Sequence, residues 1–269
     1  KFDKEHNHIV ISIMDEQKYG PLLNEIGVVV HTLSFPKGKI KFSGFFKLYR
    51  LIKQIKPDVV QTWLDHADMI GGIVARLAGI KNIVWGVHHT ALVKGESKLS
   101  TIFISKINVF LSYFIPKKII YCAHESKKAQ EKIGYKKAKG VVVLNGYDIE
   151  GFTQNDSLSV EIRNDLSINA DSFLIGHVGR YDPQKDLSNL IEAFALLNQK
   201  KLDFDAVIVG ANLDNNNRAL VSMLNKNGLS KYVHLLGRRD DINAIMNGID
   251  LFVLSSKSEA FPNVLNEAM

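Results

Sequence analysis

The chain has 269 residues, enough for two domains with substantial cores, and its 46% hydrophobic content is ordinary for a globular protein. Its single cysteine excludes an internal disulfide and fits a reducing compartment. Residues 1–145 carry 23 lysines and arginines against 11 acidic residues, a formal charge of +12, and residues 146–269 carry 11 against 17, a charge of −6.

The first half alternates strand and helix patterns. Apolar runs of strand length cover Ile9–Ile13, Val28–Leu33, Val59–Trp63, Ile83–Val87, Lys118–Cys122 and Val141–Leu144. Between some of them lie helical stripes, made by Phe45, Leu48, Leu51, Ile52 and Ile55, and by Ile70, Ile73, Val74 and Leu77. This alternation predicts βαβ units and a parallel sheet, with Cys122 as a buried structural thiol.

Polar and aromatic side chains follow two of these strands. Trp63, Asp65 and His66 come after the third run, and His88 and His89 come after the fourth. A neutral imidazole can donate a hydrogen bond to a hydroxyl or handle a proton. From the residues alone, a structural histidine is an equally good interpretation.

The segment Thr101–Ile115 contains one helical stripe, made by Phe103, Ile107, Phe110, Leu111 and Phe114. It is too short for a membrane span and contains Lys106. A stripe of this kind fits core packing, which we favour, and also fits a helix that lies in a membrane interface between basic flanks.

Lysines cluster in the first half, at Lys37, Lys39, Lys41, Lys117, Lys118, Lys127, Lys128, Lys132, Lys136, Lys137 and Lys139. The clusters predict contact with an anionic partner. A membrane surface fits better than nucleic acid, because the aromatic interleaving of a single-strand binder is sparse. A merely solvated face is the alternative.

The halves meet near Asn145-Gly146-Tyr147-Asp148, which by itself reads as an ordinary turn. Residues 153–171 are polar and poor in strand patterns, as in an interdomain segment. We therefore predict an N-terminal domain at residues 1–145 and a C-terminal domain at residues 146–269.

The second half opens with the apolar run Phe173–Val178, followed by Gly179, Arg180 and, five residues on, Lys185. Glycine lets the backbone approach a ligand, arginine can bind two phosphate oxygens, and lysine adds a flexible charge. Asp186 is predicted to cap the next helix, whose apolar positions are Leu187, Leu190, Ile191, Phe194 and Leu197.

Strands and helices continue to alternate, at Ala206–Val209, Arg218–Lys226, Tyr232–Leu236, Asp241–Met246 and Ile249–Ser255. Four residues follow strands: Gly179, Gly210, Gly237 and Ser255. Ligands of parallel sheets bind beyond the carboxyl ends of the strands, so these residues mark four candidate loops along one edge.

The chain closes with Glu259 and Glu267, which have seven residues between them, around a predicted helix start at Pro262 and Asn263. Free amides and the positive end of the helix dipole suit a diphosphate over the segment Phe261–Val264. Carboxylates on either side can accept hydrogen bonds from sugar and ribose hydroxyls. Solvated surface acids are the alternative at this spacing.

The segment from Glu259 to Glu267 resembles the Glu-x7-Glu motif of family 4 glycosyltransferases. The run Gly179-Arg180 to Lys185 is similar to that family's phosphate loop, and Asn145-Gly146-Tyr147-Asp148 resembles its domain crossover. The chain departs from the family at Ala260, where glycine is usual; this matters little if the φ of Ala260 is negative.

The resemblance implies an α/β protein of the GT-B fold, with two Rossmann-like domains whose parallel sheets face across a cleft, and retaining transfer. It implies that His88, Arg180, Lys185 and Glu259 serve catalysis. The implied donor-binding residues are Gly179, Arg180, Lys185, Gly210, Gly237, Arg238, Glu259, Phe261, Pro262, Asn263, Val264 and Glu267. Trp63, His66, His88 and His89 are weaker candidates on the acceptor side, and Arg238 and Arg239 are equally well read as solvated.

Other chemistry has little support. Asp203-Phe204-Asp205 spells the Asp-x-Asp of metal-dependent glycosyltransferases of the other major fold, but it precedes its strand. His124-Glu125 lacks a second histidine, and there is no P-loop and no nucleophile elbow. We therefore predict no cofactor and no metal requirement.

The resemblance implies transfer of a hexose or N-acetylhexosamine, with UDP the favoured nucleotide, to a glycan or lipid-diphosphate-linked acceptor in bacterial surface-polysaccharide synthesis. The expected location is cytoplasmic, peripheral on the inner face of the membrane, with no nucleic-acid partner. A GT-B enzyme with a soluble acceptor, a sugar-nucleotide epimerase and a non-catalytic nucleotide-sugar-binding protein remain alternatives. We also expect both family termini to be missing from the sequence.

Overall fold

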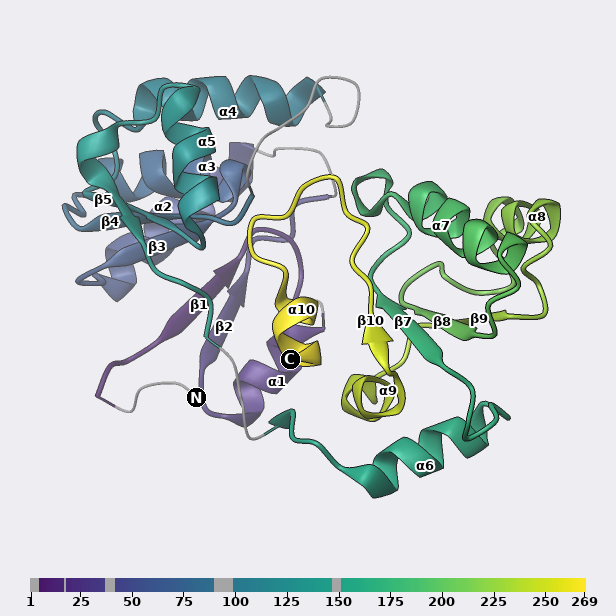
Figure 1. Cartoon of the computed structure of the whole chain (residues 1–269). Coiled ribbons are helices and arrows are strands. Elements are labelled where there is room, and N and C mark those ends of the chain that lie inside the picture. Colours follow the sequence, from purple (N-terminus) through teal and green to yellow (C-terminus); the bar gives the residue numbers. More distant parts are fainter. Residues whose placement is uncertain (1–4, 17, 37–41, 90–98, 147–150) are drawn as a thin grey trace. The chain divides into compact units, whose positions relative to one another are not determined.

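A computed structural model describes residues 5–16, 18–36, 42–89, 99–146 and 151–269 (Figure 1). The chain divides into two compact units, unit 1 with Lys1–His88 and Leu92–Val143, and unit 2 with His89–Ala91 and Leu144–Met269. Predicted residues Lys37, Lys39, Lys41, Tyr147 and Asp148 lie outside the described part of the chain.

Unit 1 contains a four-stranded parallel sheet and a separate parallel pair of strands. The sheet has the order β3 (Val60–Trp63), β4 (Ile83–Val87), β5 (Lys118–Tyr121) and β6 (Gly140–Val142), and the pair is β1 (Ile9–Ser12) with β2 (Val29–Thr32). The helices are α1 (Tyr19–Glu25), α2 (Phe42–Ile55), α3 (Asp65–Leu77), α4 (Leu99–Leu111) and α5 (His124–Lys132). All six strand predictions are confirmed, with ends that shift by a residue or two.

The core of unit 1 lies against β4 and β5. Ile83, Trp85 and Ile119 are fully buried, because strands covered by helices on both faces are apolar throughout. Cys122 is buried as predicted, and burial raises the pKa of its thiol.

An apolar cavity of about 410 Å³ lies between β1 and β3. Ile9 and Ile11 line it from one strand and Val60 and Thr62 from the other, with Leu48 and Ile52 of α2. Within the described residues, β1 pairs only with β2, and β3 pairs only with β4. The sheet of unit 1 is therefore in two pieces.

Unit 2 contains a second four-stranded parallel sheet, in the order β10 (Leu251–Phe252), β7 (Leu174–Val178), β8 (Asp205–Val209) and β9 (Val233–Gly237). Its helices are α6 (Asp156–Asp165), α7 (Leu187–Gln199), α8 (Arg218–Lys226), α9 (Ile242–Gly248) and α10 (Asn263–Ala268). The central strands β7 and β8 are buried almost throughout, with one apolar cluster on each face of the sheet.

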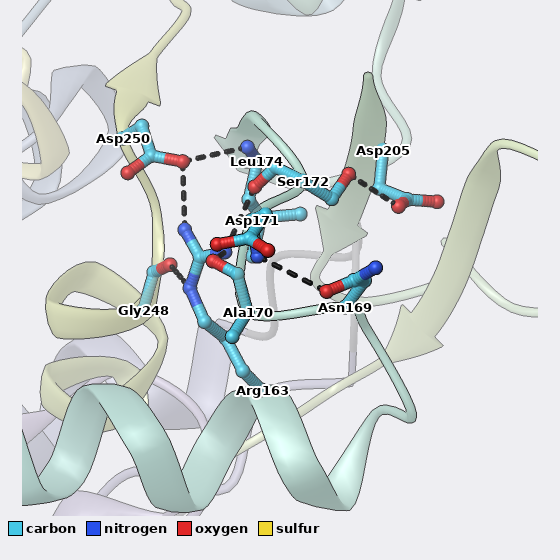
Figure 2. A network of polar contacts seen from close by, with 9 residues as sticks. All are labelled: Arg163, Asn169, Ala170, Asp171, Ser172, Leu174, Asp205, Gly248 and Asp250. Carbon is cyan, nitrogen blue, oxygen red and sulfur yellow. Dashed lines mark hydrogen bonds and ion pairs between the residues drawn. The ribbon is translucent and has the colours of Figure 1, made fainter. Parts of the chain in front are cut away.

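The amino edge of this sheet is held by a polar network around Arg163 of α6 (Figure 2). The guanidinium donates to the carbonyls of Gly248 and Ser172, both at 2.9 Å, and to Asp250 Oδ2 at 2.6 Å. Asp250 Oδ2 also accepts from the Leu174 amide at 2.7 Å, so one carboxylate joins the starts of β7 and β10 to α6.

Three elements of unit 2 differ in part from their predictions. The segment at residues 153–171 contains no strand, as predicted, but it belongs to unit 2, and its helix α6 buries Ile162 and Arg163. The apolar run Ile249–Ser255 forms a strand of two residues, because the loop that follows bends away to bond with the segment around Lys185. The Asp186 carboxylate caps no backbone amide of α7. Asp186 has a left-handed φ of 49°, its carbonyl accepts from the Leu190 amide at 3.3 Å, and its carboxylate accepts from the Ser188 hydroxyl at 3.0 Å.

The favoured prediction that the stripe of Phe103, Ile107, Phe110, Leu111 and Phe114 packs in the core is wrong for its three phenylalanines, whereas Leu111 packs against the core. Each of these phenylalanines is 65% exposed. Helix α4 turns Ile104, Ser105 and Asn108 inward instead, and Asn108 Nδ2 donates to the Asp65 carbonyl at 2.8 Å. The inward face therefore contains buried Ile104 beside two small polar residues, and the hydrogen bond of Asn108 holds it against the start of α3.

The formal charges divide with the units. Residues 1–145 carry +12 and residues 146–269 carry −6. The residues that the predicted boundary and the observed units assign differently, His89–Ala91 with Leu144 and Asn145, include no lysine, arginine, aspartate or glutamate. In the part of the chain that the structure describes, no helix is both long and apolar enough to cross a membrane.

Candidate active site

Four loops meet at the carboxyl edge of the sheet in unit 2. The Gly179 amide donates to the Val209 carbonyl at 2.9 Å, and the Gly210 amide donates to the Gly237 carbonyl at 2.7 Å. A Cβ atom at Gly210 would lie 1.5 Å from the Gly179 carbonyl oxygen, and Gly210 has a φ of 145°. Only glycine fits this crossing, because the backbones of two loops touch there.

The fourth loop joins the site through Lys185. The Ser255 hydroxyl donates to the Lys185 carbonyl at 2.7 Å, and the Lys257 amide donates to the Gln184 carbonyl at 2.9 Å. The Gln184 side chain bonds in turn to the Ser258 carbonyl. These bonds fix the 3₁₀ turn η3 (Pro183–Lys185) against the loop that precedes Glu259.

Lys185 and Glu259 form an ion pair in this setting. The Lys185 ammonium lies 2.6 Å from Glu259 Oε1, and the two side chains are only 17% and 20% exposed. The two predicted residues are thus in one place, and each satisfies the charge of the other.

Two arginines beside these loops have open guanidinium groups. Arg180 and Arg238 are exposed, and within the described residues neither makes a hydrogen bond or ion pair. Arg239 differs, because Asp241 accepts from its Nε at 2.8 Å. The site therefore offers Arg180 and Arg238 to an anion, while Arg239 is held in the fold.

Helix α10 begins at Asn263 as predicted, with Pro262 at its cap. Pro262 has no N–H, so only three amides of the segment Phe261–Val264 can donate. The backbone φ of Ala260 is not positive, so the loss of the usual glycine causes no strain there. Glu267 is half-buried on α10, and burial raises the pKa of its carboxyl.

The crossover segment contacts the start of this helix. Asn145 Nδ2 donates to Asn263 Oδ1 at 3.2 Å. Val264 packs on the apolar cluster that also contains Ile162 and Ile245. These two contacts set the position of α10 within unit 2.

His177 is a site residue that the sequence interpretation missed. It is fully buried on β7, its Nδ1 lies 3.0 Å from the Val253 carbonyl oxygen, and its Nε2 has no partner among the described residues. Burial lowers the pKa of its imidazole, and the nearby Lys185 charge lowers it further. A histidine inside the apolar run Phe173–Val178 is the signal that could have identified it.

The predicted acceptor-side residues follow neighbouring strands of unit 1. Trp63 ends β3 and pairs in register with Gly86 of β4, where a Cβ atom would lie 2.8 Å from the indole. His66 is exposed in the first turn of α3, and His88 is exposed directly after β4. The structure thus places Trp63, His66 and His88 at one edge, whereas the half-buried His89 belongs to unit 2.

A buried acid that sequence reasoning did not single out lies beneath this edge. Asp68 is 1% exposed, and its Oδ1 accepts from the Thr62 hydroxyl at 2.5 Å. Burial raises the pKa of Asp68 well above its usual range. The preceding Leu64 has a φ of 74° and a ψ of 154°, a strained conformation at the turn into α3.

Two family descriptions cover most of the chain. "Glycosyltransferase Family 4" matches residues 3–150, and "Glycosyl transferases group 1" matches residues 159–269. The chain is 31% identical over 229 residues to the UDP-Gal:alpha-D-GlcNAc-diphosphoundecaprenol alpha-1,3-galactosyltransferase of Escherichia coli, an alignment that covers 84% of this chain. The chain belongs to glycosyltransferase family 4.

A second relative is also a glycosyltransferase. The N,N'-diacetylbacillosaminyl-diphospho-undecaprenol alpha-1,3-N-acetylgalactosaminyltransferase of Campylobacter jejuni is 23% identical over 98% of the chain and 71% of its own length. The Escherichia coli relative is matched over 58% of its length, so this family 4 chain spans little more than half of that protein.

Solved structures show the fold. HepE of Anabaena, in complex with UDP and glucose, aligns with a TM-score of 0.81 at 23% identity, over 97% of this chain and 70% of that one. The lipopolysaccharide outer core galactosyltransferase WaaB aligns with a TM-score of 0.63 at 15% identity, over 94% and 65%. The predicted α/β GT-B fold class of this family 4 chain is confirmed.

The acidic pair that resembled a metal motif is structural. Asp205 begins β8, at the edge opposite the glycine loops, and its Oδ2 accepts from the Ser172 hydroxyl at 2.7 Å (Figure 2). Its Oδ1 lies 3.2 Å from His234 Nε2. Asp203-Phe204-Asp205 is therefore remote from the candidate site, while the expectation that the enzyme needs no metal stays a prediction.

Proposed function

We propose that this family 4 chain is a retaining glycosyltransferase, which transfers a hexose or N-acetylhexosamine from a UDP sugar to a glycan or lipid-diphosphate-linked acceptor. The observation that carries the proposal is the Lys185–Glu259 pair at the carboxyl edge of the sheet, with the open Arg180 guanidinium beside it. The names of the relatives, which include transferases that act on diphosphoundecaprenol-linked sugars, support the acceptor class.

The donor diphosphate would lie between Arg180, Lys185 and the start of α10. As the bond to the sugar breaks, negative charge grows on the departing diphosphate, and preorganised cations and amides stabilise it. Glu259 would accept hydrogen bonds from the sugar and Glu267 from the ribose. No metal enters this scheme, because Arg180 and Lys185 supply the positive charge.

The acceptor hydroxyl would approach from the edge that carries Trp63, His66 and His88. His88 is exposed there, so its imidazole can donate to a sugar hydroxyl in the transition state. The whole protein would work in the cytoplasm, against the inner face of the membrane, with the lysines of unit 1 toward anionic lipid in surface-polysaccharide assembly.

The proposal is tested with the full-length protein and a panel of UDP, GDP and ADP sugars, with and without a lipid-diphosphate extract and with and without EDTA. We expect nucleotide release from a UDP sugar, stimulated by the extract and insensitive to EDTA. The Arg180→Ala variant should lose at least about 100-fold in turnover, the usual effect of removing one charge-stabilising group.

Arg218→Ala is the matched control, because Arg218 is also an exposed arginine of unit 2. Equal activity of the wild type and Arg180→Ala would contradict the role of Arg180. Binding of the UDP sugar without any release of nucleotide would contradict catalysis. An epimerised sugar as product would show that the protein is an epimerase and not a transferase.

A further inference from the structure

Helix α4 turns its phenylalanines away from the core of unit 1. Leu99, Phe103, Lys106 and Phe110 recur at intervals of four, three and four residues, so they share one face. Leu99 is 72% exposed, and Phe103 and Phe110 are 65% exposed. The opposite face buries Ile104 together with the small polar residues Ser105 and Asn108. Large apolar side chains that stay exposed on one face of a helix mark an interaction site.

The aromatic surface continues past the end of the helix. Phe114 is 65% exposed, and its ring centroid lies 5.3 Å from that of Phe110. Tyr113 is 46% exposed, at 6.4 Å from Phe114. We call Leu99, Phe103, Phe110, Tyr113 and Phe114 the aromatic patch. The exposed apolar side chains thus continue from one face of α4 into the turn after it.

Positive charge borders the aromatic patch. The Lys136 ammonium lies 5.0 Å from the centroid of the Tyr113 ring. Lys139 Nζ donates to the carbonyls of Ser112 at 2.9 Å and Tyr113 at 2.7 Å, so it is fixed at the same turn. Lys106 lies within the apolar face itself, and the sequence of α4 contains no acidic residue.

We propose that the aromatic patch is a membrane-docking surface, which inserts its rings at the boundary of headgroups and acyl chains in an anionic bilayer. Apolar rings bordered by lysines and a tyrosine match such an interface, because the rings enter the apolar layer and the lysines meet lipid phosphates. A polar protein partner would give the aromatic rings no apolar surroundings. An acidic partner would need only the lysines and would not account for the rings. The inference depends on the proposed function in one respect, namely that a lipid-linked acceptor would lie in a membrane.

The test is sedimentation of the protein with vesicles of phosphatidylcholine mixed with phosphatidylglycerol, and with vesicles of phosphatidylcholine alone. We expect binding to the mixed vesicles that weakens with salt. The double variant Phe103→Ser, Phe110→Ser should bind at least about tenfold more weakly, a change of about 1.4 kcal/mol in binding free energy. Both side chains are exposed, so circular dichroism should show an unchanged fold.

The matched control is Phe42→Ser, Phe46→Ser, which removes two phenylalanines on α2 of the same unit that are 84% and 67% exposed. This control should bind vesicles like the wild type. Equal losses in both double variants, or no binding of the wild type, would overturn the proposal. A wild-type dimer that Phe103→Ser, Phe110→Ser converts to a monomer, with vesicle binding unchanged, would assign the patch to a second copy instead.

A separate readout distinguishes this inference from the proposed function. Isothermal titration with UDP reports the donor site in unit 2, and the α4 variants should bind UDP like the wild type. A wild-type protein that binds UDP but not vesicles contradicts the membrane inference alone. A wild-type protein that binds vesicles but not UDP contradicts the proposed donor site alone.

Discussion

Lys185 and Glu259 lie 2.6 Å apart, so an anion that takes the lysine must compete with the glutamate. In Glu259→Gln an amide replaces the carboxylate and no longer attracts the ammonium. We expect this variant to bind UDP up to about tenfold more tightly, equivalent to about 1.4 kcal/mol, while sugar transfer falls. Titration calorimetry with UDP and a transfer assay measure the two effects.

Glu192→Gln serves as the control for that variant, because Glu192 is exposed on α7 of the same unit. It should change neither quantity. Weaker UDP binding by Glu259→Gln would show that the carboxylate positions Lys185 for the phosphate rather than competing with it.

His177 predicts how stability depends on pH. Burial lowers its pKa in the folded protein, so the unfolded chain binds the proton more readily. The contribution of His177 is fully present above the unfolded pKa of about 6.5 and is lost as the pH falls toward the folded pKa. As the pH is lowered below about 6.5, we expect the urea concentration at the unfolding midpoint of unit 2 to decrease. This decrease should be smaller in His177→Gln.

His124→Gln, at an exposed position, should keep the full pH dependence. If His177→Gln also retains it, another group is responsible.

The sequence identified Lys185 and Glu259 separately but not their contact. They lie 74 positions apart, and their contact depends on hydrogen bonds between two loops that carry no pattern of their own. Asp68 and His177 were missed for a different reason. Hydrophobic periodicity depends on the apolar residues of a segment and does not single out one buried polar residue among them.

At the scale of elements, Gly210 is the position where two loops cross. In Gly210→Ala the new Cβ would lie 1.5 Å from the Gly179 oxygen, at a φ of 145°. We expect a loss of more than about 2 kcal/mol in the free energy of unfolding, measured with urea, because both strain and overlap contribute. UDP affinity should fall as well, since the Gly179 loop must move.

Gly146→Ala is the control, because nothing lies within 4 Å of a Cβ at Gly146 and its φ is not positive. A Gly210→Ala variant as stable as Gly146→Ala would show that the crossing of the loops relaxes without cost.

Elements with long periodic patterns were predictable, and short or polar ones were not. The Arg218–Lys226 helix is predicted to the residue because its apolar positions recur over the whole segment. The stripe on α4 predicted a helix correctly but the wrong side for the core. Periodicity shows that an apolar face exists, and only the packing of Ser105 and Asn108 shows where it points.

At the scale of the whole molecule, the sheet of unit 1 is in two pieces. Within the described residues β1 and β2 pair only with each other, and neither strand contains a fully buried residue. Two-stranded sheets are marginal, so local opening should need little free energy. Hydrogen exchange of the 269-residue chain should show faster exchange for Ile9–Ser12 than for Ile83–Val87. Equal protection of the two strands would contradict this.

The two units carry formal charges of opposite sign, so a charged surface attracts one unit and repels the other. An anionic bilayer attracts the unit that carries +12 and repels the unit that carries −6. The repelled unit carries the Lys185–Glu259 pair, so the field of the membrane would hold the nucleotide site out in the aqueous phase, where dissolved sugar donors are found. The same field would slow anionic donors near the lipid, and the mostly acidic unit 2 would admit them only through its local cluster of arginine and lysine.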